Sequence, residues 1–380
     1  MTPNPVVAIC MATWNPPPEL FRKQIVSLQA QEHTSWICFV QDDCSTDASF
    51  RDIISILSDD PRFIIERNTQ NLGFYRTFEK SLSRVPEDIP FVALSDQDDE
   101  WYPEKLSRCL EAFDDRTSLV YSDMRITDAD GGILFDTYWQ KRANEYRSFE
   151  AVFFANTVTG ASAVFRRNVL ATALPFPSGV TQGLHDWWIA LNAMLSGTFQ
   201  YIDAPLYNYV QHGRNAVGHP LLRPKIKELR APKRISSLPS PISLPRRLRR
   251  YVIGKIESYG KPREPLALLL HYQRTANMLL ERFAATDILP TNRRFLEDIG
   301  RLSFTRFAGE ALRSLWRSRS TVGAERHAFR NLLRAKTRDP LGPVIDTLLQ
   351  EIRFGKGPLD ERDPAGRKPI FIGIGSRARR

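Results

Sequence analysis

The sequence predicts an α/β fold with a mostly parallel central sheet, followed by a basic, largely helical C-terminal region. Short apolar runs alternate with helical patterns over the first 125 residues, acidic clusters follow two of these runs, and charge and proline content change near residue 220. Such alternation is typical of βαβ units. At roughly 150 residues to a domain, the chain divides into residues 1–219 and an accessory region, 220–380, that begins with a proline-rich linker, 220–247.

The first 125 residues are predicted to form strands and helices in strict alternation. The strand candidates are short and apolar throughout, as expected when helices cover both faces of a sheet. The expected strands are Val6–Ala12, Trp36–Gln41, Phe63–Glu66, Phe91–Ser95 and Leu119–Ser122, and the expected helices between them are Glu19–Gln31, Ala48–Leu57, Phe74–Val85 and Pro103–Phe113. Pro16–Pro18 predict a loop before the first helix, and Asp47 is expected to N-cap the second.

After Asp123 the alternation becomes less regular. The pattern predicts a turn at Asp128–Gly132, a short helix at Ser148–Asn156, an extended segment at Thr159–Arg167, a helix at Asp186–Leu195 and a last strand at Tyr201–Tyr209. This unit should end near Gly218. Beyond it, amphipathic helices are expected at Leu266–Phe283, Arg294–Leu302 and Phe304–Trp316.

The net charge of +10 hides two parts of opposite sign. Residues 1–219 carry 18 basic and 28 acidic side chains, whereas residues 220–380 carry 35 and 15. No apolar run approaches the roughly 20 residues of a membrane-spanning helix, and the N-terminus has no secretory pattern. The four cysteines form no Cys-x-x-Cys pair, so buried reduced thiols are expected. The protein is therefore expected to be cytoplasmic.

Both acidic clusters follow predicted strands at their carboxyl ends, where open α/β sheets bind ligands. The first runs from Asp42 to Asp47, and the second contains Asp96, Asp98 and Asp99. Three carboxylates so close together repel one another unless a cation is present, and Mg²⁺ or Mn²⁺ with a diphosphate substrate fits such a group. A solvated acidic turn is the alternative for either cluster alone. Together, the clusters favour a binding site.

These residues resemble the inverting family 2 glycosyltransferases of the GT-A fold. The resemblance covers about residues 5–218 and looks closest to the bacterial rhamnosyltransferase branch. Its motifs are Thr13-Trp14-Asn15, Asp42-Asp43-x-Ser-x-Asp47, Asn71-Leu72-Gly73, Ser95-Asp96-Gln97-Asp98-Asp99-x-Trp101, Thr159-Gly160, His185-Asp186-Trp187-Trp188 and Gln211-His212-Gly213-x-Asn215. Cys44 departs from the pattern, since Gly or Asn is commoner there, and His185 stands where Glu is commoner.

The resemblance implies a donor site, a metal site and a base. Asp42 or Asp43 would contact the nucleobase, and the remaining donor-binding residues would be Thr13, Asn15, Asn71, Gly73, Arg76, Asp96, His185, Trp187 and Arg214. Asp98 would be the main metal ligand, with Asp96 and His212 beside it. Asp186 matches the catalytic base, a role that His185 could share or tune. Asp186 could instead be only the N-cap of its helix.

The expected reaction is inverting transfer of rhamnose from dTDP-rhamnose to a saccharide or lipid-linked saccharide in bacterial surface polysaccharide synthesis. A metal would stabilise the leaving diphosphate, and a base would take the acceptor proton. Alternatives are a metal-dependent nucleotidyltransferase and a non-catalytic protein that binds membranes or nucleic acid. The first would need a Gly-rich phosphate loop, which Asn15–Pro18 do not supply.

The basic C-terminal region has two competing interpretations. Arginine-rich amphipathic helices suit an anionic membrane surface, which would place the enzyme on the inner face of the plasma membrane beside a lipid-linked acceptor. Alternatively, the helices form an accessory region that packs on the catalytic domain or on a second subunit. No nucleic-acid-binding module is recognisable in the sequence, so no nucleic-acid partner is expected.

Overall fold

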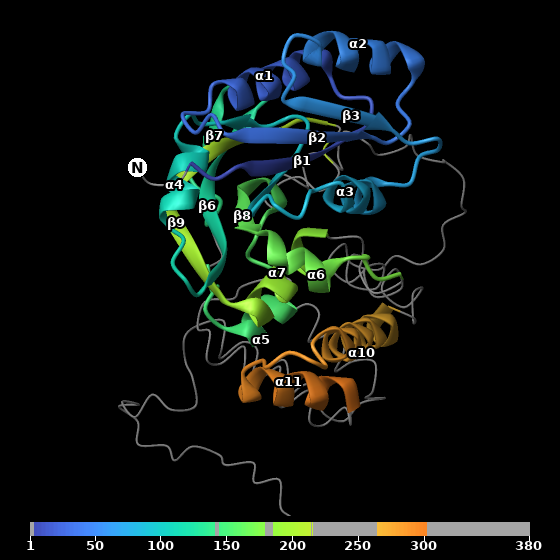
Figure 1. Ribbon diagram of the computed structural model, residues 1–380, viewed down its shortest axis with the longest axis vertical. Coiled ribbons are helices and arrows are strands. Elements are labelled where there is room, and N and C mark those ends of the chain that lie inside the picture. The colour runs from blue at the N-terminus through green and yellow to red at the C-terminus, as the bar shows by residue number, and fades with distance from the viewer. Residues whose placement is uncertain (1–3, 141–143, 179–184, 214, 216–263, 302–380) are drawn as a thin grey trace, which may run out of the picture.

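The computed structural model describes residues 4–140, 144–178, 185–213, 215 and 264–301, and it confirms the α/β prediction. Its strands form one mixed sheet in the order β3-β2-β1-β4-β8-β6-β9-β5, with β7 paired to β6 (Figure 1). The strands are β1 (Val7–Thr13), β2 (Trp36–Asp42), β3 (Phe63–Arg67), β4 (Phe91–Ser95), β5 (Glu100–Trp101), β6 (Thr117–Asp128), β7 (Ile133–Phe135), β8 (Ala163–Arg166) and β9 (Thr198–Gln211).

The first four strands are parallel, and their register brings the predicted motifs to one edge. Thr13 at the end of β1 pairs with Asp42 at the end of β2, and Met11 pairs with Ser95 at the end of β4. On the outer side, Asp42 pairs with Arg67 of β3. Both acidic clusters therefore start at the carboxyl edge of the same sheet, as expected for a ligand-binding edge.

Strand β8 runs antiparallel between β4 and β6, and β6 runs parallel to β9. The register aligns Ala93, Val164 and Val120 across three strands. Because β8 is reversed, its amino end lies at the same edge as the carboxyl ends of β4 and β6. The segment that precedes β8, which contains the Thr159-Gly160 motif, is thereby carried to the site.

Helices cover both faces of the sheet. In Figure 1, α1 and α2 lie on one face of the β1–β3 region and α3 lies on the other. The helices of this unit are α1 (Pro18–Gln29), α2 (Asp47–Leu57), α3 (Phe74–Ser83), α4 (Lys105–Glu111), α5 (Phe149–Phe154), α6 (Leu170–Ala173) and α7 (His185–Ser196), with 3₁₀ turns η1 (Gly160–Ser162) and η2 (Arg167–Val169). Helix α7 is buried along most of its length and contributes Trp188, which is 0% exposed, to the core.

Two C-terminal helices, α10 (Glu264–Arg282) and α11 (Pro290–Arg301), lie beside α5 (Figure 1). Their core is aromatic: the Phe153 ring lies 5.5 Å from Tyr272 of α10 and 5.3 Å from Phe295 of α11. Arg282 donates hydrogen bonds to the carbonyl oxygens of Leu174 and Pro175. This part of the basic region thus packs on the α/β unit, as the accessory interpretation expects.

The structure departs from the predicted elements in several places, and β5, β7 and α6 were not predicted. Thr46, not Asp47, caps α2, because the Thr46 hydroxyl accepts the Ser49 N–H while Asp47 pairs with Arg67. The predicted strand at Leu119–Ser122 is longer, since β6 continues to Asp128 alongside β9. The extended segment Thr159–Arg167 divides into η1 and β8. The predicted helix Phe304–Trp316 lies outside the described residues.

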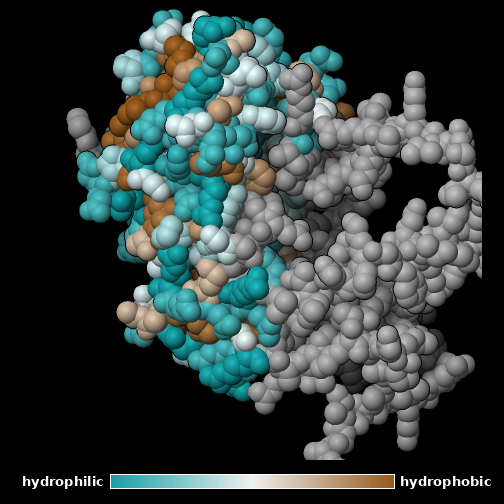
Figure 2. All heavy atoms as spheres, turned by 90° about the vertical axis from the view of Figure 1, so that its right-hand side faces the viewer, coloured by the Kyte–Doolittle hydropathy of each residue, from teal (hydrophilic) through white to brown (hydrophobic). Residues whose placement is uncertain are grey.

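Among the described residues, no helix combines the length and apolar character needed to cross a bilayer. The described surface in Figure 2 is mainly hydrophilic, with hydrophobic residues in small groups.

Candidate active site

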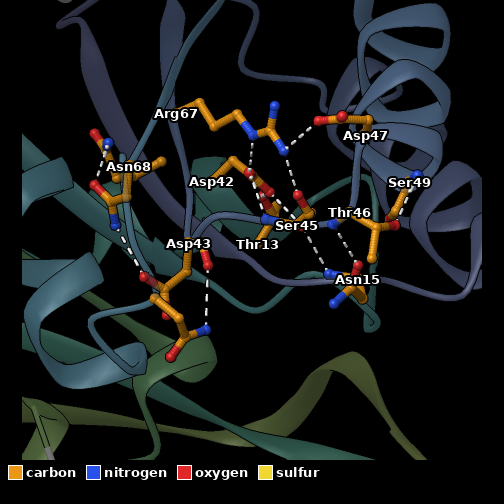
Figure 3. Close-up of polar contacts among 12 residues, drawn as sticks. Thr13, Asn15, Asp42, Asp43, Ser45, Thr46, Asp47, Ser49, Arg67 and Asn68 are labelled. Carbon is orange, nitrogen blue, oxygen red and sulfur yellow. Dashed lines mark hydrogen bonds and ion pairs between the residues drawn. The ribbon is translucent and has the colours of Figure 1, made fainter.

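The first acidic cluster is a buried network in which Asp42 holds the loop between β2 and α2 (Figure 3). Asp42 is 0% exposed, and its carboxylate accepts hydrogen bonds from the Thr13 hydroxyl at 3.2 Å and from the Ser45 N–H at 2.9 Å. The Arg67 guanidinium lies 3.5 Å from it. With these partners Asp42 ties β1, the loop and β3 together.

Asp43 performs a similar task for the loop that leads into α3. Its carboxylate accepts the backbone N–H groups of Leu72 at 2.7 Å and Gly73 at 2.8 Å, and the Asn68 amide at 3.0 Å. The Asn71 side chain donates to the Asp43 carbonyl at 3.1 Å. The Asn71-Leu72-Gly73 motif is therefore fixed against the first cluster. Asp42 and Asp43, one of which was expected to contact the nucleobase, both accept hydrogen bonds inside the protein.

Two residues beside Ser45 have left-handed backbone, one in the β1–α1 loop and one in the β2–α2 loop. Asn15 has φ of 42° and Cys44 has φ of 60°. Asn tolerates this region, whereas a side chain such as Cys meets steric strain there. Asn15 also joins the network, since its N–H donates to the Ser45 hydroxyl and its side chain accepts the Thr46 N–H (Figure 3). The commoner Gly or Asn at position 44 thus has a conformational explanation.

The second cluster contains two carboxyl groups whose protonation is strongly perturbed. Burial, together with the neighbouring carboxylates of Asp98 and Asp186, raises the pKa of Asp96 to about 7. Burial also raises the pKa of Asp99 well above its usual value. Asp99 accepts the Val210 N–H at 3.1 Å, while its second oxygen has no hydrogen-bond partner among the described residues. A cation bound beside Asp96 and Asp99 would stabilise their ionised forms.

Asp98 and His212 meet across the site. His212 Nε2 lies 2.7 Å from Asp98 Oδ2, and both side chains are about one-tenth exposed. His212 stands just beyond the end of β9, and its N–H donates to the Asn215 side chain. The structure thereby brings together two of the three predicted metal ligands, with Asp96 in the same loop.

Asp186 is the second residue of α7. Burial raises the pKa of the Asp186 carboxyl to about 6, although hydrogen bonds from the backbone N–H groups of Trp187 and Gly160 oppose the rise. A side chain at Gly160 would have its Cβ 3.7 Å from the Asp186 Cβ and 3.0 Å from His185 Nε2. Gly160 therefore allows the close approach of η1 to α7. Asp186 lies inside the first turn of α7, not at the predicted N-cap position, and the N–H groups that it accepts are compatible with a base role.

The imidazole ring of His185 is neutral and packs against an aromatic ring. Its ring stacks on Phe78, with centroids 3.9 Å apart and planes 16° apart, and neither ring nitrogen has a hydrogen-bond partner among the described residues. Burial lowers the pKa of His185 to about 3. A histidine in this state supports the wall beside Asp186 and stays neutral near neutral pH.

Two other predicted donor residues have partners inside the protein. Trp187 is 6% exposed and packs in the core, where its indole donates to the Val152 carbonyl and its ring stacks on His271 at 5.2 Å. Arg76 donates to Glu79 and to the Phe176 carbonyl. Arg214 lies outside the described residues. The structure therefore does not place Trp187 on an open donor pocket.

One charged residue at the site was missed by the sequence analysis. Lys105 is 0% exposed, and its ammonium group lies beneath the second acidic cluster. The signal was present as a lysine four residues after Trp101, inside a predicted helix. Helical periodicity alone gave no reason to expect it to be buried.

The donor set fits a divalent cation by its chemistry. Mg²⁺ commonly binds one or two protein carboxylates together with substrate phosphates, and Asp96, Asp98 and His212 offer oxygen and nitrogen donors. Within the described ranges, no group of three or more His, Cys, Asp or Glu side chains encloses a metal position by itself. The residues therefore fit a metal whose remaining ligands come from the donor.

Comparisons with known proteins identify one family and several proteins to which this chain is similar. The model of the family "Glycosyl transferase family 2" matches residues 8–173, which include both acidic clusters and Gly160. The chain is 31% identical over 108 residues to the putative colanic acid biosynthesis glycosyl transferase WcaA of Escherichia coli; the match covers 28% of this chain and 37% of WcaA, so little more than a third of that protein is spanned.

Two further similarities cover more of the chain. The dTDP-rhamnosyl transferase RfbG of Shigella flexneri is 27% identical over 214 residues, which cover 52% of this chain and 70% of RfbG. The crystal structure of S. aureus TarS 1–349 superposes with a TM-score of 0.49 at 15% identity, over 92% of this chain and 87% of that one. The family match covers residues 8–173, which build both acidic clusters, so this part of the α/β unit is similar to glycosyl transferase family 2.

Proposed function

We propose that this protein transfers a sugar from a nucleotide-sugar donor to an acceptor hydroxyl, with Asp186 as catalytic base and Asp96, Asp98 and His212 at the donor diphosphate. The observation that carries the proposal is the convergence of three distant segments. Asp98 and His212 are 2.7 Å apart, and Asp186 lies close enough to raise the pKa of Asp96. A metal-bound diphosphate and a base are the two groups that sugar transfer requires.

In the proposed reaction the acceptor oxygen attacks the anomeric carbon as the bond to the nucleoside diphosphate breaks. The Asp186 carboxylate takes the hydroxyl proton, and the backbone N–H groups that it accepts fix its orientation. Asp96 and Asp98, with His212, would hold Mg²⁺ or Mn²⁺, which supplies Lewis-acid stabilisation of the departing diphosphate. Asp42, Asp43 and Asn71 act indirectly in this proposal, because they hold the loops that line the nucleotide.

We propose dTDP-rhamnose as donor and a saccharide or lipid-linked saccharide of the bacterial surface as acceptor. The similarity to RfbG supports rhamnose, and the similarity to WcaA supports polysaccharide synthesis. Retention on an anionic membrane belongs to the same proposal and depends on the basic residues after position 220. Co-sedimentation with anionic and neutral vesicles tests this part: equal binding to both, or binding to neither, contradicts it.

The reaction is tested by incubating the full chain with Mg²⁺ or Mn²⁺, saccharide acceptors and a panel of nucleotide sugars while nucleoside diphosphate release is followed. We expect release from dTDP-rhamnose that depends on acceptor and is lost in Asp186→Asn. Asp115→Asn is the matched control, since Asp115 is an exposed carboxylate outside the site. If dTDP-rhamnose, UDP-sugars and GDP-sugars all stay intact, the proposed function is wrong.

A further inference from the structure

Lys105 is an unusual residue because its charge has no access to water. It is the first residue of α4 and is 0% exposed, and no other lysine or arginine in the described segments is as buried. Burial of a charged group is costly unless other groups compensate for its lost hydration. The groups that surround Lys105 therefore indicate what the residue is for.

Three contacts compensate for the lost hydration of the ammonium group. Lys105 Nζ donates a hydrogen bond to the carbonyl oxygen of Ala161 in η1. It lies 3.7 Å from the centroid of the Trp101 ring and 4.7 Å from that of Tyr207. Aromatic faces attract cations, and the attraction is largest where water is excluded.

Two carboxyl groups of the second acidic cluster add to this attraction. Burial lowers the pKa of Lys105 to about 7, while the Cys109 thiol, Asp99 and Asp96 oppose the decrease. In return, Lys105 lowers the pKa of both Asp96 and Asp99. The lysine and the acidic cluster thus stabilise one another's charged forms.

The partners of Lys105 come from three segments that build the site. Asp96 and Asp99 belong to the loop between β4 and β5, and Trp101 is the last residue of β5. The end of β4 is held by α1 through the Gln24 to Ser95 hydrogen bond of 2.8 Å. Ala161 follows Gly160, which lies against Asp186. Tyr207 belongs to β9, which leads to His212. One buried cation therefore contacts the donor side and the base side of the site together.

We propose that Lys105 is a positioning residue that fixes the 96–101 loop against η1, so that the donor carboxylates keep a defined place relative to Asp186. The expected effect on the donor KM rests on the proposed function, whereas the expected effect on hydrogen exchange does not. Lys105 touches neither donor nor acceptor, and it acts through Trp101, Ala161 and the acidic cluster.

The first test is hydrogen exchange on Lys105→Met, which keeps the side-chain length and removes the charge. Because the change leaves the Ala161 carbonyl and the buried Asp96 and Asp99 without their cation, the variant should unfold at a lower temperature. Amides of residues 96–101 and 159–162 should exchange about tenfold faster, while those of β2 and β3 should change less. Unchanged exchange in both site segments overturns the proposal.

Arg166→Met is the matched control. Arg166 also stacks on two rings, Phe91 and Phe113, and donates to backbone carbonyls, but it lies at the opposite edge of the sheet. The Arg166→Met variant should have a lower unfolding temperature, and its hydrogen exchange at residues 96–101 and 159–162 should be unchanged. Lys105→Gln, which keeps a hydrogen-bond donor without the charge, replaces Lys105→Met if that variant does not fold.

The second test separates this inference from the proposed function. With an active wild-type protein, Lys105→Met should raise the donor KM about tenfold or more and leave the acceptor KM unchanged, whereas Arg166→Met should change neither. An unchanged donor KM overturns the positioning role. If the wild-type protein transfers no sugar, the proposed function fails, and hydrogen exchange still decides whether Lys105 fixes the two segments.

Discussion

His212 Nε2 lies 2.7 Å from Asp98 Oδ2, although the two residues are 114 positions apart in the chain. The contact exists because β9 runs beside β6 at the far side of the sheet and ends at the same edge as β4. It closes the acidic loop from the side opposite the first cluster. A histidine and a carboxylate in this arrangement offer two donors to a cation that also binds a diphosphate.

Replacement of Asp98 by Ala should weaken donor binding only when metal is present. Since Asp98 is the expected metal ligand, the affinity for dTDP or UDP with Mg²⁺ should fall on the order of 100-fold, whereas the weak affinity without metal should hardly change. Isothermal titration calorimetry with and without EDTA measures both. Asp115→Ala serves as the control. An equal loss in both conditions would contradict the metal role of Asp98.

The raised pKa of Asp186 predicts how transfer depends on pH. A base must be ionised, so kcat should rise with pH through a midpoint near 6 and level off above it. Initial rates between pH 4.5 and pH 8 give the midpoint. Asp186→Asn should abolish transfer and leave donor affinity within about twofold, because the residue acts on the acceptor. A variant that loses donor binding instead would reverse the assignment.

The same pKa shift predicts a change in stability. Because the folded pKa is raised, the folded state binds more protons than the unfolded state between pH 4 and 6, so the free energy of unfolding falls as pH rises through this window. Asp186→Asn removes this penalty and should stabilise the protein by about 1–2 kcal/mol at pH 7. Urea unfolding at pH 4 and pH 7 checks the sign; a gain that is larger at pH 4 would contradict it.

Asp43→Ala should lower the stability of the fold. The change leaves the N–H groups of Leu72 and Gly73 without their acceptor, which should lower the free energy of unfolding by about 2–4 kcal/mol. Urea unfolding measures the loss. Asp47→Ala is the control, since Asp47 is exposed and its ion pair with Arg67 is worth less than about 1 kcal/mol. Equal losses in both variants would argue against this role of Asp43.

Cys44→Gly should stabilise the protein. Cys44 has φ of 60°, where a Cβ costs about 1–2 kcal/mol and Gly has no such penalty. The greater freedom of Gly in the unfolded chain offsets part of the gain, so about 0.5–1 kcal/mol should remain. Thermal unfolding measures it, and Cys44→Val should shift the midpoint in the opposite direction because a β-branched residue fits this backbone poorly.

Local signals explain why much of the fold was predictable. The apolar runs at Val7–Thr13 and Phe91–Ser95 carry their strand preference in their own residues, and the acidic clusters directly after Asp42 and Ser95 marked the edge where ligands bind. The reversed β8 was harder to predict, because its direction depends on its pairing with β4 and β6 and not on its four residues. The cap of α2 was misassigned because Arg67 of β3, twenty residues away, pairs with Asp47.

By itself, the sequence determined the α/β class, the place of both acidic clusters and the presence of a later His-Asp motif. Each of these features depends on a short run of neighbouring residues. Only the tertiary structure decided which side chains are free to act. It engaged Asp42 and Asp43 in the loops, packed Trp187 on His271, brought His212 to Asp98, and buried Lys105 beneath Asp96 and Asp99. Burial and hydrogen-bond partners come from distant segments, and no local pattern specifies them.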